Sequence, residues 1–200
     1  MRFDLQVIAS WIDPGSRVLD LGCGNGDLLD YLKKHKQVNG TGIEFSEDKA
    51  ARCIERGLTV LQGDFRKEVL DYPEQRFDVI VLSQTLQQVH DPKELLVDLL
   101  KIGKRVIVSF PNFAHWSARL QILFTGMAPV TDQLPYEWHN TPNIRVISIK
   151  DFKRFLRITG VRVVREVAIN THHHDYKGHI VRSFTNLRAT YGIMMLERVS

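Results

Sequence analysis

Residues 17–27 read Arg-Val-Leu-Asp-Leu-Gly-Cys-Gly-Asn-Gly-Asp, a short apolar run that ends in three glycines at alternate positions. Asp20 lies at the end of this run, and Leu28, Leu29 and Leu32 follow the glycines at the spacing of one helix face. The stretch therefore predicts a strand, a tight turn and a helix. Strand, turn and helix in this order begin the βαβ unit from which parallel sheets are built.

The same alternation continues through most of the chain. Apolar runs predict further strands at residues 40–44, 58–62, 77–82, 105–110, 161–169 and 192–198. Helical spacing predicts helices at residues 27–34, 46–55, 91–101, 112–126 and 149–159, with Ser46, Asp91 and Asn112 as N-caps. In the helix at 46–55 we expect Cys53 and Ile54 to point inward. These elements predict an α/β fold with one seven-stranded, mostly parallel sheet, in which one late strand can be antiparallel.

Two segments carry no such pattern. Residues 127–147 contain three prolines among aromatic side chains, which is typical either of a functional lid or of a cap over apolar surface. His172, His173 and His174 lie between the last two predicted strands, and adjacent histidines on an extended segment cannot all face one metal ion. We therefore expect a polar loop there and no metal site.

The composition is that of one ordinary globular domain, with 200 residues of which 44% are hydrophobic and 25% charged. No apolar run approaches the roughly 18 residues that span a bilayer. Asp4 interrupts the apolar N-terminal segment that a secretory signal would need. We therefore expect a single domain over residues 1–200, a cytoplasmic location and no membrane partner.

Charge is divided unevenly along the chain. Residues 1–100 hold 12 Lys and Arg against 17 Asp and Glu, a balance of −5, and residues 101–200 hold 15 against 6, a balance of +9. The basic half could face nucleic acid, an acidic protein or an anionic metabolite, and charge does not choose between them. Cys23 and Cys53, with 29 residues between them, predict neither a disulfide framework nor a zinc site.

The glycine turn narrows the choice of ligand. A dinucleotide fingerprint needs a small residue where Asp27 stands, because a carboxylate at that helix N-terminus repels a pyrophosphate, and no Gly-Lys-Ser/Thr of a P-loop follows. A large ligand without phosphate and with a positive centre for Asp20 fits better, as S-adenosylmethionine does. Glu44 at the next strand end can accept both ribose hydroxyls, and Asp64 after the third strand can accept from an adenine amino group beside Phe65. Taken singly, Glu44 could equally be a solvated strand end and Asp64 a turn cap.

Asp20-Leu-Gly-Cys-Gly-Asn-Gly resembles the first motif of class I S-adenosylmethionine-dependent methyltransferases, a likeness that covers residues 15–110. It implies their Rossmann-like fold, a ligand-binding half at residues 1–110 and a substrate- or partner-facing half at 111–200. It also implies that S-adenosylmethionine or S-adenosylhomocysteine is bound without a metal. The implied cofactor-binding residues are Asp20, Gly22, Cys23, Gly24, Gly26, Glu44, Phe45, Asp64, Phe65, Ser83 and Gln84.

Five further strings extend the resemblance over almost the whole chain, to the methionine biosynthesis protein MetW family. They are Leu82-Ser-Gln-Thr-Leu-Gln, Val108-Ser-Phe-Pro-Asn-Phe-Ala-His-Trp, Pro129-Val-Thr, Leu134-Pro-Tyr and Asn140-Thr-Pro-Asn-Ile. The resemblance implies a methyltransferase-like protein of methionine biosynthesis that works with homoserine O-acetyltransferase and modulates it. Phe45 and Ser46 follow Glu44 where the family has a hydrophobic residue and Asp, which keeps the carboxylate and changes what packs beside it.

Residues that could carry out methyl transfer are harder to identify. Orientation alone can promote this displacement, so a missing base says little. Ser83-Gln84-Thr85-Leu86 lacks the Asn/Asp-Pro-Pro-aromatic string of amino-methylating enzymes and the Pro-Cys of cytosine-methylating ones. Candidate bases are His90, His115, Tyr136 and His139, although packing or surface roles are more usual for such side chains. Trp116, Tyr136 and Trp138 could anchor a partner, but burial is the more usual fate of aromatic residues.

Three functions therefore remain open. The one we favour is a regulatory module that binds S-adenosylmethionine or its demethylated product and couples this binding to homoserine O-acetyltransferase. The second is an enzyme that methylates a small molecule. The third is a module that docks RNA as substrate, and because the motifs of nucleobase methylation are missing, nucleic acid is the least expected partner.

Overall fold

The computed structural model of the protein describes residues 1–172 and 175–198. This part of the chain forms one sheet of eight strands in the order β3-β2-β1-β4-β5-β8-β6-β7. The strands are β1 (Arg17–Leu21), β2 (Asn39–Glu44), β3 (Thr59–Gln62), β4 (Phe77–Ser83), β5 (Gly103–Pro111), β6 (Val161–Thr171), β7 (Gly178–Ile180) and β8 (Tyr191–Arg198). The strands β1 to β5 pair in parallel, whereas β8 runs antiparallel to β5 and β6, and β7 antiparallel to β6.

The predicted α/β class with a mostly parallel, Rossmann-like sheet is confirmed. The predicted number of seven strands is wrong, because the three residues of β7 form an additional edge strand. Such a short strand has no periodicity of its own in the sequence. It forms because the chain turns back after β6 and pairs Ile169 with Ile180.

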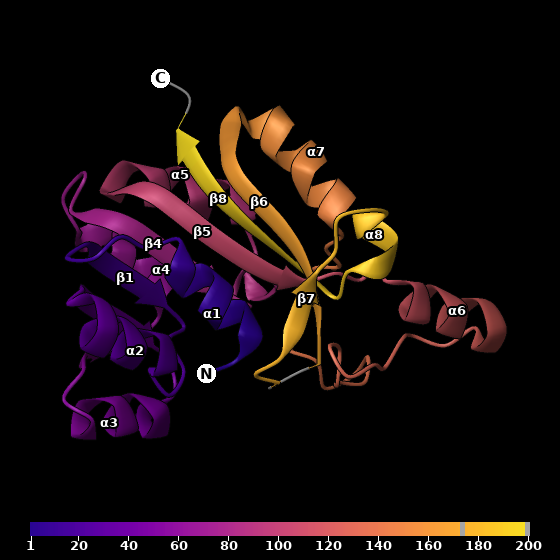
Figure 1. Cartoon of the computed structure of the whole chain (residues 1–200), viewed down its shortest axis with the longest axis horizontal. Helices are drawn as coiled ribbons and strands as arrows, with labels where there is room; N and C mark the ends of the chain where they lie inside the picture. The colour runs from indigo at the N-terminus through magenta and orange to yellow at the C-terminus, as the bar shows by residue number, and fades with distance from the viewer. Residues whose placement is uncertain (173–174, 199–200) are drawn as a thin grey trace.

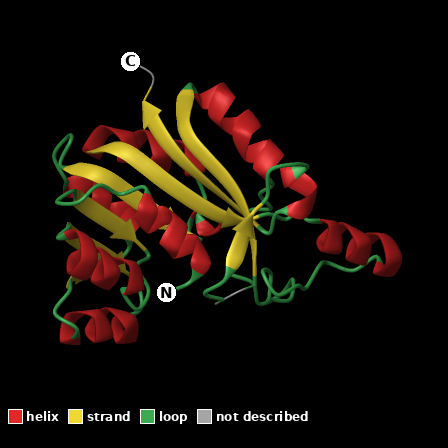
Figure 2. Cartoon of the chain, in the orientation of Figure 1, coloured by secondary structure: helices red, strands yellow, loops and turns green. Residues whose placement is uncertain are grey.

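Helices cover both faces of the sheet (Figures 1 and 2). The longer ones are α1 (Phe3–Ser10), α2 (Asp27–Lys36), α3 (Glu47–Glu55), α5 (Pro92–Ile102), α6 (Trp116–Thr125) and α7 (Ile149–Thr159). Single turns are α4 (Phe65–Glu68), α8 (Thr185–Arg188) and the 3₁₀ helices η1 (Val69–Asp71) and η2 (Leu86–Gln88). Asp91 caps α5 as predicted, since its side chain accepts from the backbone N–H groups of Lys93 and Glu94 at 3.1 Å each.

Two apolar layers hold the helices to the sheet, because neighbouring strand residues point to opposite faces. Val18 on β1 packs in the layer that contains Leu5 of α1 and Leu28 of α2. Its neighbour Leu19 packs in the other layer, with residues of α5 and α7 such as Leu156. The parallel strands are therefore covered on both sides, and their carboxyl ends all lie at one edge of the sheet.

Two local predictions are wrong. Ile54 is 57% exposed, whereas Cys53 is fully buried, because the inward face of α3 is narrow. Asn112 does not cap α6; the cap is His115, whose ring accepts from the N–H of Ser117. Asn112 is instead buried, and its amide nitrogen donates to the carbonyl of Ala189 at 2.8 Å.

The segment 116–147, which we call the α6 arm, consists of α6 and the irregular stretch that follows it. In Figures 1 and 2 α6 extends away from the sheet, and Ala118 is its one buried residue. The irregular stretch returns to the sheet where the N–H groups of Ile144 and Arg145 donate to the carbonyl of Gln87, at 3.0 Å each. The arm contains 11 of the 22 exposed large hydrophobic side chains of the described residues.

No helix in the two described ranges combines the length and the apolar character needed to cross a membrane.

Candidate functional site

The glycine turn after β1 has three residues in the left-handed region, with φ of +72° at Gly22, +58° at Gly24 and +75° at Gly26. A Cβ at Gly22 would lie 2.9 Å from the hydroxyl of Thr85, and one at Gly26 would lie 2.5 Å from Leu58. Packing therefore requires a glycine at both positions. A Cβ at Gly24 would meet nothing within 4 Å, so here the bare backbone borders open space.

That open space is a hollow of about 250 Å³ at the carboxyl end of β1. Its lining residues are Arg2, Leu5, Asp20, Gly22, Cys23, Gly24, Asn25, Asp27, Leu28, Lys49 and Ser83. We call this space the glycine-turn hollow. Five of the predicted cofactor-binding residues line it: Asp20, Gly22, Cys23, Gly24 and Ser83.

Asp20 is the most perturbed acid of this hollow. It is 3% exposed, and no hydrogen bond to its carboxylate is found among the described residues. Burial raises the pKa of Asp20 to about 7; the charge of Arg2 opposes this rise and that of Glu44 adds to it. A buried carboxylate without a hydrogen-bond donor is costly, and a cationic ligand group in the hollow would relieve that cost.

Glu44 lies at the end of β2 and is 8% exposed. It does not line the glycine-turn hollow, but one carboxylate oxygen accepts from the N–H of Gly24 at 2.8 Å and the other from the N–H of Ser46 at 2.9 Å. Glu44 therefore joins the glycine turn to the start of α3. Each oxygen keeps a second lone pair that a ribose hydroxyl could use.

The predicted adenine side is arranged differently. Asp64 is the N-cap of α4, where it accepts from the N–H of Arg66 and forms an ion pair with the guanidinium of Arg66 at 2.6 Å. Phe65 packs partly buried against the main core, and Phe45 is 75% exposed. None of these three side chains lines the glycine-turn hollow. The contacts of Asp64 are those of the turn cap considered above, and an adenine role for it stays a prediction.

The end of β4 borders the hollow through Ser83. The hydroxyl of Ser83 accepts from Arg2 at 3.3 Å and from Ser109 at 3.2 Å. Gln84 adopts φ of +56°, a strained conformation for a residue with a side chain, and its amide donates to Asp4 at 3.0 Å. Gln84 thus faces α1 and not the hollow.

Sequence reasoning missed the contribution of the N-terminal segment. Arg2 and Leu5 line the hollow, and Asp4 is 2% exposed in an ion pair with Arg2 at 3.0 Å. The signal was present, because Leu5, Ile8 and Ala9 follow helical spacing, and a buried acid within such a face needs a partner.

The candidate bases lie elsewhere. None of His90, His115, Tyr136 and His139 lines the glycine-turn hollow. The expectation that the aromatic side chains Trp116, Tyr136 and Trp138 are buried is wrong, because they are 49%, 48% and 77% exposed. They lie on the α6 arm, where no second layer covers them in the described chain.

The described residues contain no group of three or more His, Cys, Asp and Glu side chains that could hold a metal ion. His172 lies in the loop between β6 and β7, and its ring nitrogen is 3.2 Å from Asp132. His173 and His174, which the prediction of a polar loop also covers, lie outside the described residues. Cys23 and Cys53 are free thiols, and Cys53 donates to the carbonyl of Gly24 at 3.3 Å.

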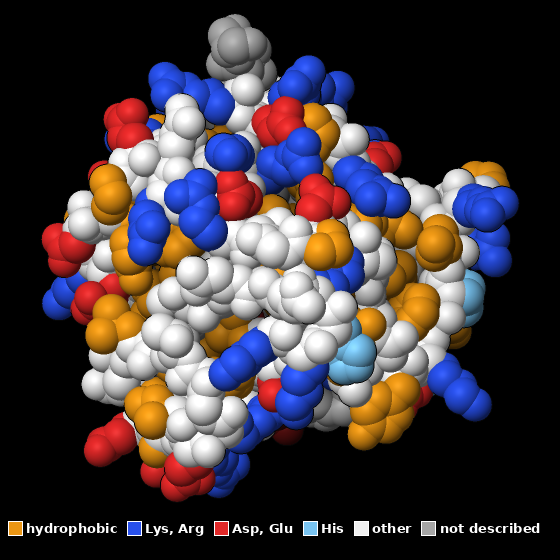
Figure 3. Space-filling view, turned by 60° about the vertical axis from the view of Figure 1, so that its left-hand side comes forward, with side chains coloured by type: hydrophobic (Ala, Val, Ile, Leu, Met, Phe, Trp, Pro, Cys, Tyr) orange, Lys and Arg blue, Asp and Glu red, His pale blue; other side chains and the backbone are white. Residues whose placement is uncertain are grey.

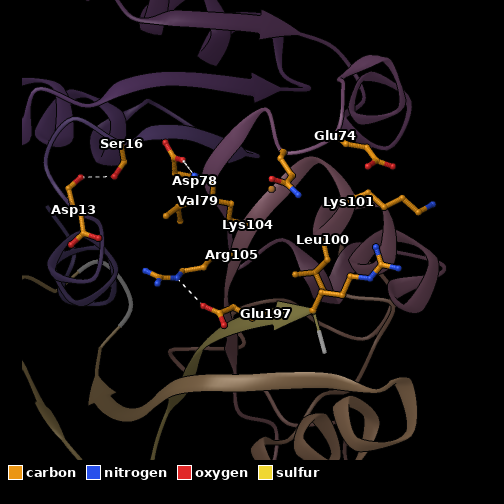
Figure 4. A pocket seen from close by; sticks show the side chains of 13 residues that line it. Asp13, Ser16, Glu74, Asp78, Val79, Leu100, Lys101, Lys104, Arg105 and Glu197 are labelled. Carbon is orange, nitrogen blue, oxygen red and sulfur yellow. Dashed lines mark hydrogen bonds and ion pairs between the residues drawn. The ribbon is translucent and has the colours of Figure 1, made fainter. Parts of the chain in front are cut away.

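A larger hollow of about 580 Å³ lies at the opposite end of the strands (Figure 4). Several of its charges are paired with one another. Asp78 accepts from Arg17 at 3.2 Å and from Lys104 at 2.8 Å, and these contacts hold the pKa of Asp78 far below its usual range. Glu197 pairs with Arg105 at 2.9 Å. This end of a parallel sheet is not where ligands bind in α/β folds, so the smaller hollow is the better candidate.

On the face that Figure 3 shows, Lys and Arg side chains do not form an unbroken field. In Figure 3 they lie mostly in the upper half of the face, with Asp and Glu between them. Several are paired, as in Arg162 with Glu197 at 2.7 Å and Lys153 with Glu166 at 2.7 Å. The face shown in Figure 3 lacks the continuous cationic stripe that binding to a nucleic acid backbone uses.

Comparison with known proteins places these features in context. The model of the family described as methionine biosynthesis protein MetW matches residues 2–196. The bifunctional methionine biosynthesis protein MetXA/MetW of Rhodopirellula baltica is 33% identical over 176 residues, which cover 84% of this chain. The chain spans only 28% of the length of that relative.

Solved structures share the fold at low sequence identity. A SAM-dependent methyltransferase of Thermotoga maritima, described as a possible histamine N-methyltransferase, is 20% identical with a TM-score of 0.71, covering 98% of this chain and 88% of its own. The [4+2]-cyclase SpnF is 18% identical with a TM-score of 0.66, covering 97% and 80%. One fold thus carries both a methyltransferase and a protein described as a cyclase, so the fold alone does not decide the chemistry.

Proposed function

The chain belongs to the methionine biosynthesis protein MetW family, and on this basis we propose that it binds S-adenosylmethionine or S-adenosylhomocysteine in the glycine-turn hollow and regulates homoserine O-acetyltransferase. The observation that carries the ligand proposal is the buried Asp20 carboxylate beside the open backbone of Gly24. Both lie at the carboxyl end of β1, the binding position of α/β sheets.

The residues present fit such a ligand. Asp20 offers an anion that has no hydrogen-bond donor among the described residues, which suits the ammonium group of the methionine part. Gly24 lets a large ligand approach the backbone, and the spare lone pairs of Glu44 suit the ribose hydroxyls. Asp27 at the start of α2 disfavours phosphate-bearing ligands. In this proposal residues 1–110 provide the ligand site.

Two observations support a protein partner: the two-part name of the MetXA/MetW relative and the exposed apolar side chains of the α6 arm. The name MetXA/MetW joins two parts in one polypeptide, and this chain matches 28% of it. We take the MetXA part to be the acetyltransferase. The α6 arm presents Leu123 and Phe124 at 72% and 79% exposure, and apolar patches of this kind mark interaction sites. Regulation then requires that the ligand bind differently to the free and the associated protein.

A comparison of two glycine variants tests the ligand proposal. Gly24 and Gly15 both have positive φ, of +58° and +73°, and a Cβ at either would meet nothing within 4 Å. Alanine at either position should cost about 1–2 kcal/mol of stability, but only Gly24→Ala places a methyl group against the hollow. We expect Gly24→Ala to weaken S-adenosylhomocysteine binding in calorimetry at least about tenfold, and Gly15→Ala to leave it unchanged. Equal affinities for both variants would contradict the proposed site.

The second candidate function is methyl transfer to a small molecule. It is favoured by the S-adenosylmethionine-dependent methyltransferase fold. No histidine or tyrosine among the candidate bases lines the hollow, so an acceptor that needs no deprotonation would suit it best. Formation of S-adenosylhomocysteine above the rate without acceptor would support this function.

A further inference from the structure

Arg2 is the cation that is fixed at the glycine-turn hollow. Its guanidinium donates to both oxygens of Asp4, from Nε at 3.1 Å and from Nη2 at 3.0 Å, and Nη2 also lies 3.3 Å from the Ser83 hydroxyl. Asp4 is itself buried and held by the amide of Gln84 at 3.0 Å. These contacts orient the planar guanidinium before any ligand arrives.

The Arg2 side chain keeps unused donors. Nε and Nη2 make the contacts with Asp4 and Ser83, and for Nη1 the described part of the chain offers no hydrogen-bond partner. The side chain is 26% exposed and lines the hollow. A guanidinium that already has one face paired can still donate to an incoming carboxylate from the other.

Arg2 and Asp20 lie on the same hollow with opposite charges. The charge of Arg2 lowers the pKa of Asp20, although burial raises it by more. An anion and a cation that border one hollow of about 250 Å³ are the complement of a zwitterion. Lys49 also lines the hollow, but it is exposed, and its ammonium group has no hydrogen bond or ion pair within the described ranges.

We propose that Arg2 binds the α-carboxylate of the ligand while Asp20 binds its α-ammonium group, so that the hollow selects ligands with an intact amino-acid end. This inference rests on the proposed binding of S-adenosylhomocysteine. It assigns to the segment before α1 a role in recognition. Asp4 and Gln84 are then positioning residues, since Asp4 holds the guanidinium, Gln84 holds Asp4, and neither touches the ligand.

The test uses titration calorimetry to measure the affinities of two ligands for the wild-type protein and for variants of two arginines. One ligand is S-adenosylhomocysteine, and the other is S-adenosyl-3-thiopropylamine, which lacks only the carboxylate. Arg2→Ala should weaken binding of the first at least about tenfold and leave binding of the second within about twofold. Arg17→Ala is the matched control, because it also removes an Arg–Asp pair, but at the opposite end of β1. It should leave the affinity for both ligands unchanged.

The same experiment distinguishes an error in the role of Arg2 from an error in the proposed ligand site. If the wild-type protein binds neither ligand, the proposed ligand site itself is wrong. If it binds both and Arg2→Ala weakens both equally, or neither, the role of Arg2 is overturned. If Arg2→Ala does not fold, because Asp4 is left buried without its partner, Arg2→Gln provides the same comparison, since Gln can still donate to Asp4. The selective loss should persist in Arg2→Gln.

Discussion

At the scale of single residues, the protonation of Asp20 should control ligand affinity. Burial raises the pKa of Asp20 to about 7, so near neutral pH the ligand-free protein holds this carboxyl partly protonated. An ammonium group binds the ionised form, and affinity for S-adenosylhomocysteine should therefore fall by up to about tenfold for each pH unit below 7 and level off above it. Calorimetry between pH 5.5 and 8.5 measures this. An affinity that does not change with pH would show that Asp20 does not bind the ammonium group of the ligand.

The same shift has a consequence for stability, with a defined sign. The pKa of Asp20 is higher in the folded than in the unfolded chain, so its contribution to stability is full below about pH 4 and is lost as the pH rises through 7. Asp20→Asn removes this loss. Without ligand, the variant should match the wild type near pH 4 and exceed it near pH 8, by at most about 4 kcal/mol.

Glu44 should show a double effect, because it touches both the turn and the proposed ribose position. Glu44→Ala removes the acceptors of the Gly24 and Ser46 N–H groups, which should cost about 1–3 kcal/mol of stability. It also removes charge-assisted bonds to the ribose hydroxyls, so affinity for S-adenosylhomocysteine should fall at least about tenfold. Denaturant titration and calorimetry separate the two effects. A variant that is destabilised but binds with unchanged affinity would leave Glu44 a purely structural role.

At the scale of elements, the sequence predicts what local rules decide. Three such features have the predicted structure: the glycine turn, the strand from Arg17 to Leu21, and the helix that begins at the proline after Asp91. β7 and the cap of α6 depend on how distant segments meet, and the sequence pattern does not contain this. Asn112 has the residue type of a cap but bonds to Ala189, 77 positions away.

The same distinction applies to the site. Asp20 and Gly24 could be placed from their position after a strand, whereas Arg2 reaches the hollow only because α1 packs across the sheet. Asp64 was open to two interpretations; it has the contacts of a turn cap because Arg66 turns back to it, and its adenine role stays a prediction. The aromatic residues of the α6 arm are of types that are usually buried in a core. Only the three-dimensional structure shows that no described element covers them.

The α6 arm should matter for association more than for folding. Leu123→Glu with Phe124→Glu changes two side chains that are 72% and 79% exposed, so the melting temperature should stay the same. If the arm contacts homoserine O-acetyltransferase, the affinity for that enzyme should drop more than about tenfold. Ile158→Glu on α7, a residue 75% exposed, is the control. Retained affinity in the double variant would place the contact elsewhere.

At the scale of the whole molecule, the two ends of the sheet have different roles. The amino ends carry paired charges such as Asp78 with Arg17 and Lys104, which satisfy one another and stabilise the fold. The carboxyl ends leave Asp20 without a hydrogen-bond partner in the described chain and the Gly24 backbone open. The α6 arm follows β5 at this same end. The ligand site and the candidate contact surface therefore both lie at the carboxyl end of the parallel strands.

The most direct measurement is the turnover of homoserine O-acetyltransferase titrated with this protein, with and without S-adenosylhomocysteine. We expect turnover to change until the two proteins reach a fixed ratio, and the ligand to shift the midpoint of the titration. Gly24→Ala should keep the change in turnover and lose the shift. Turnover that stays constant over the whole titration, with and without the ligand, would show that this protein does not regulate homoserine O-acetyltransferase.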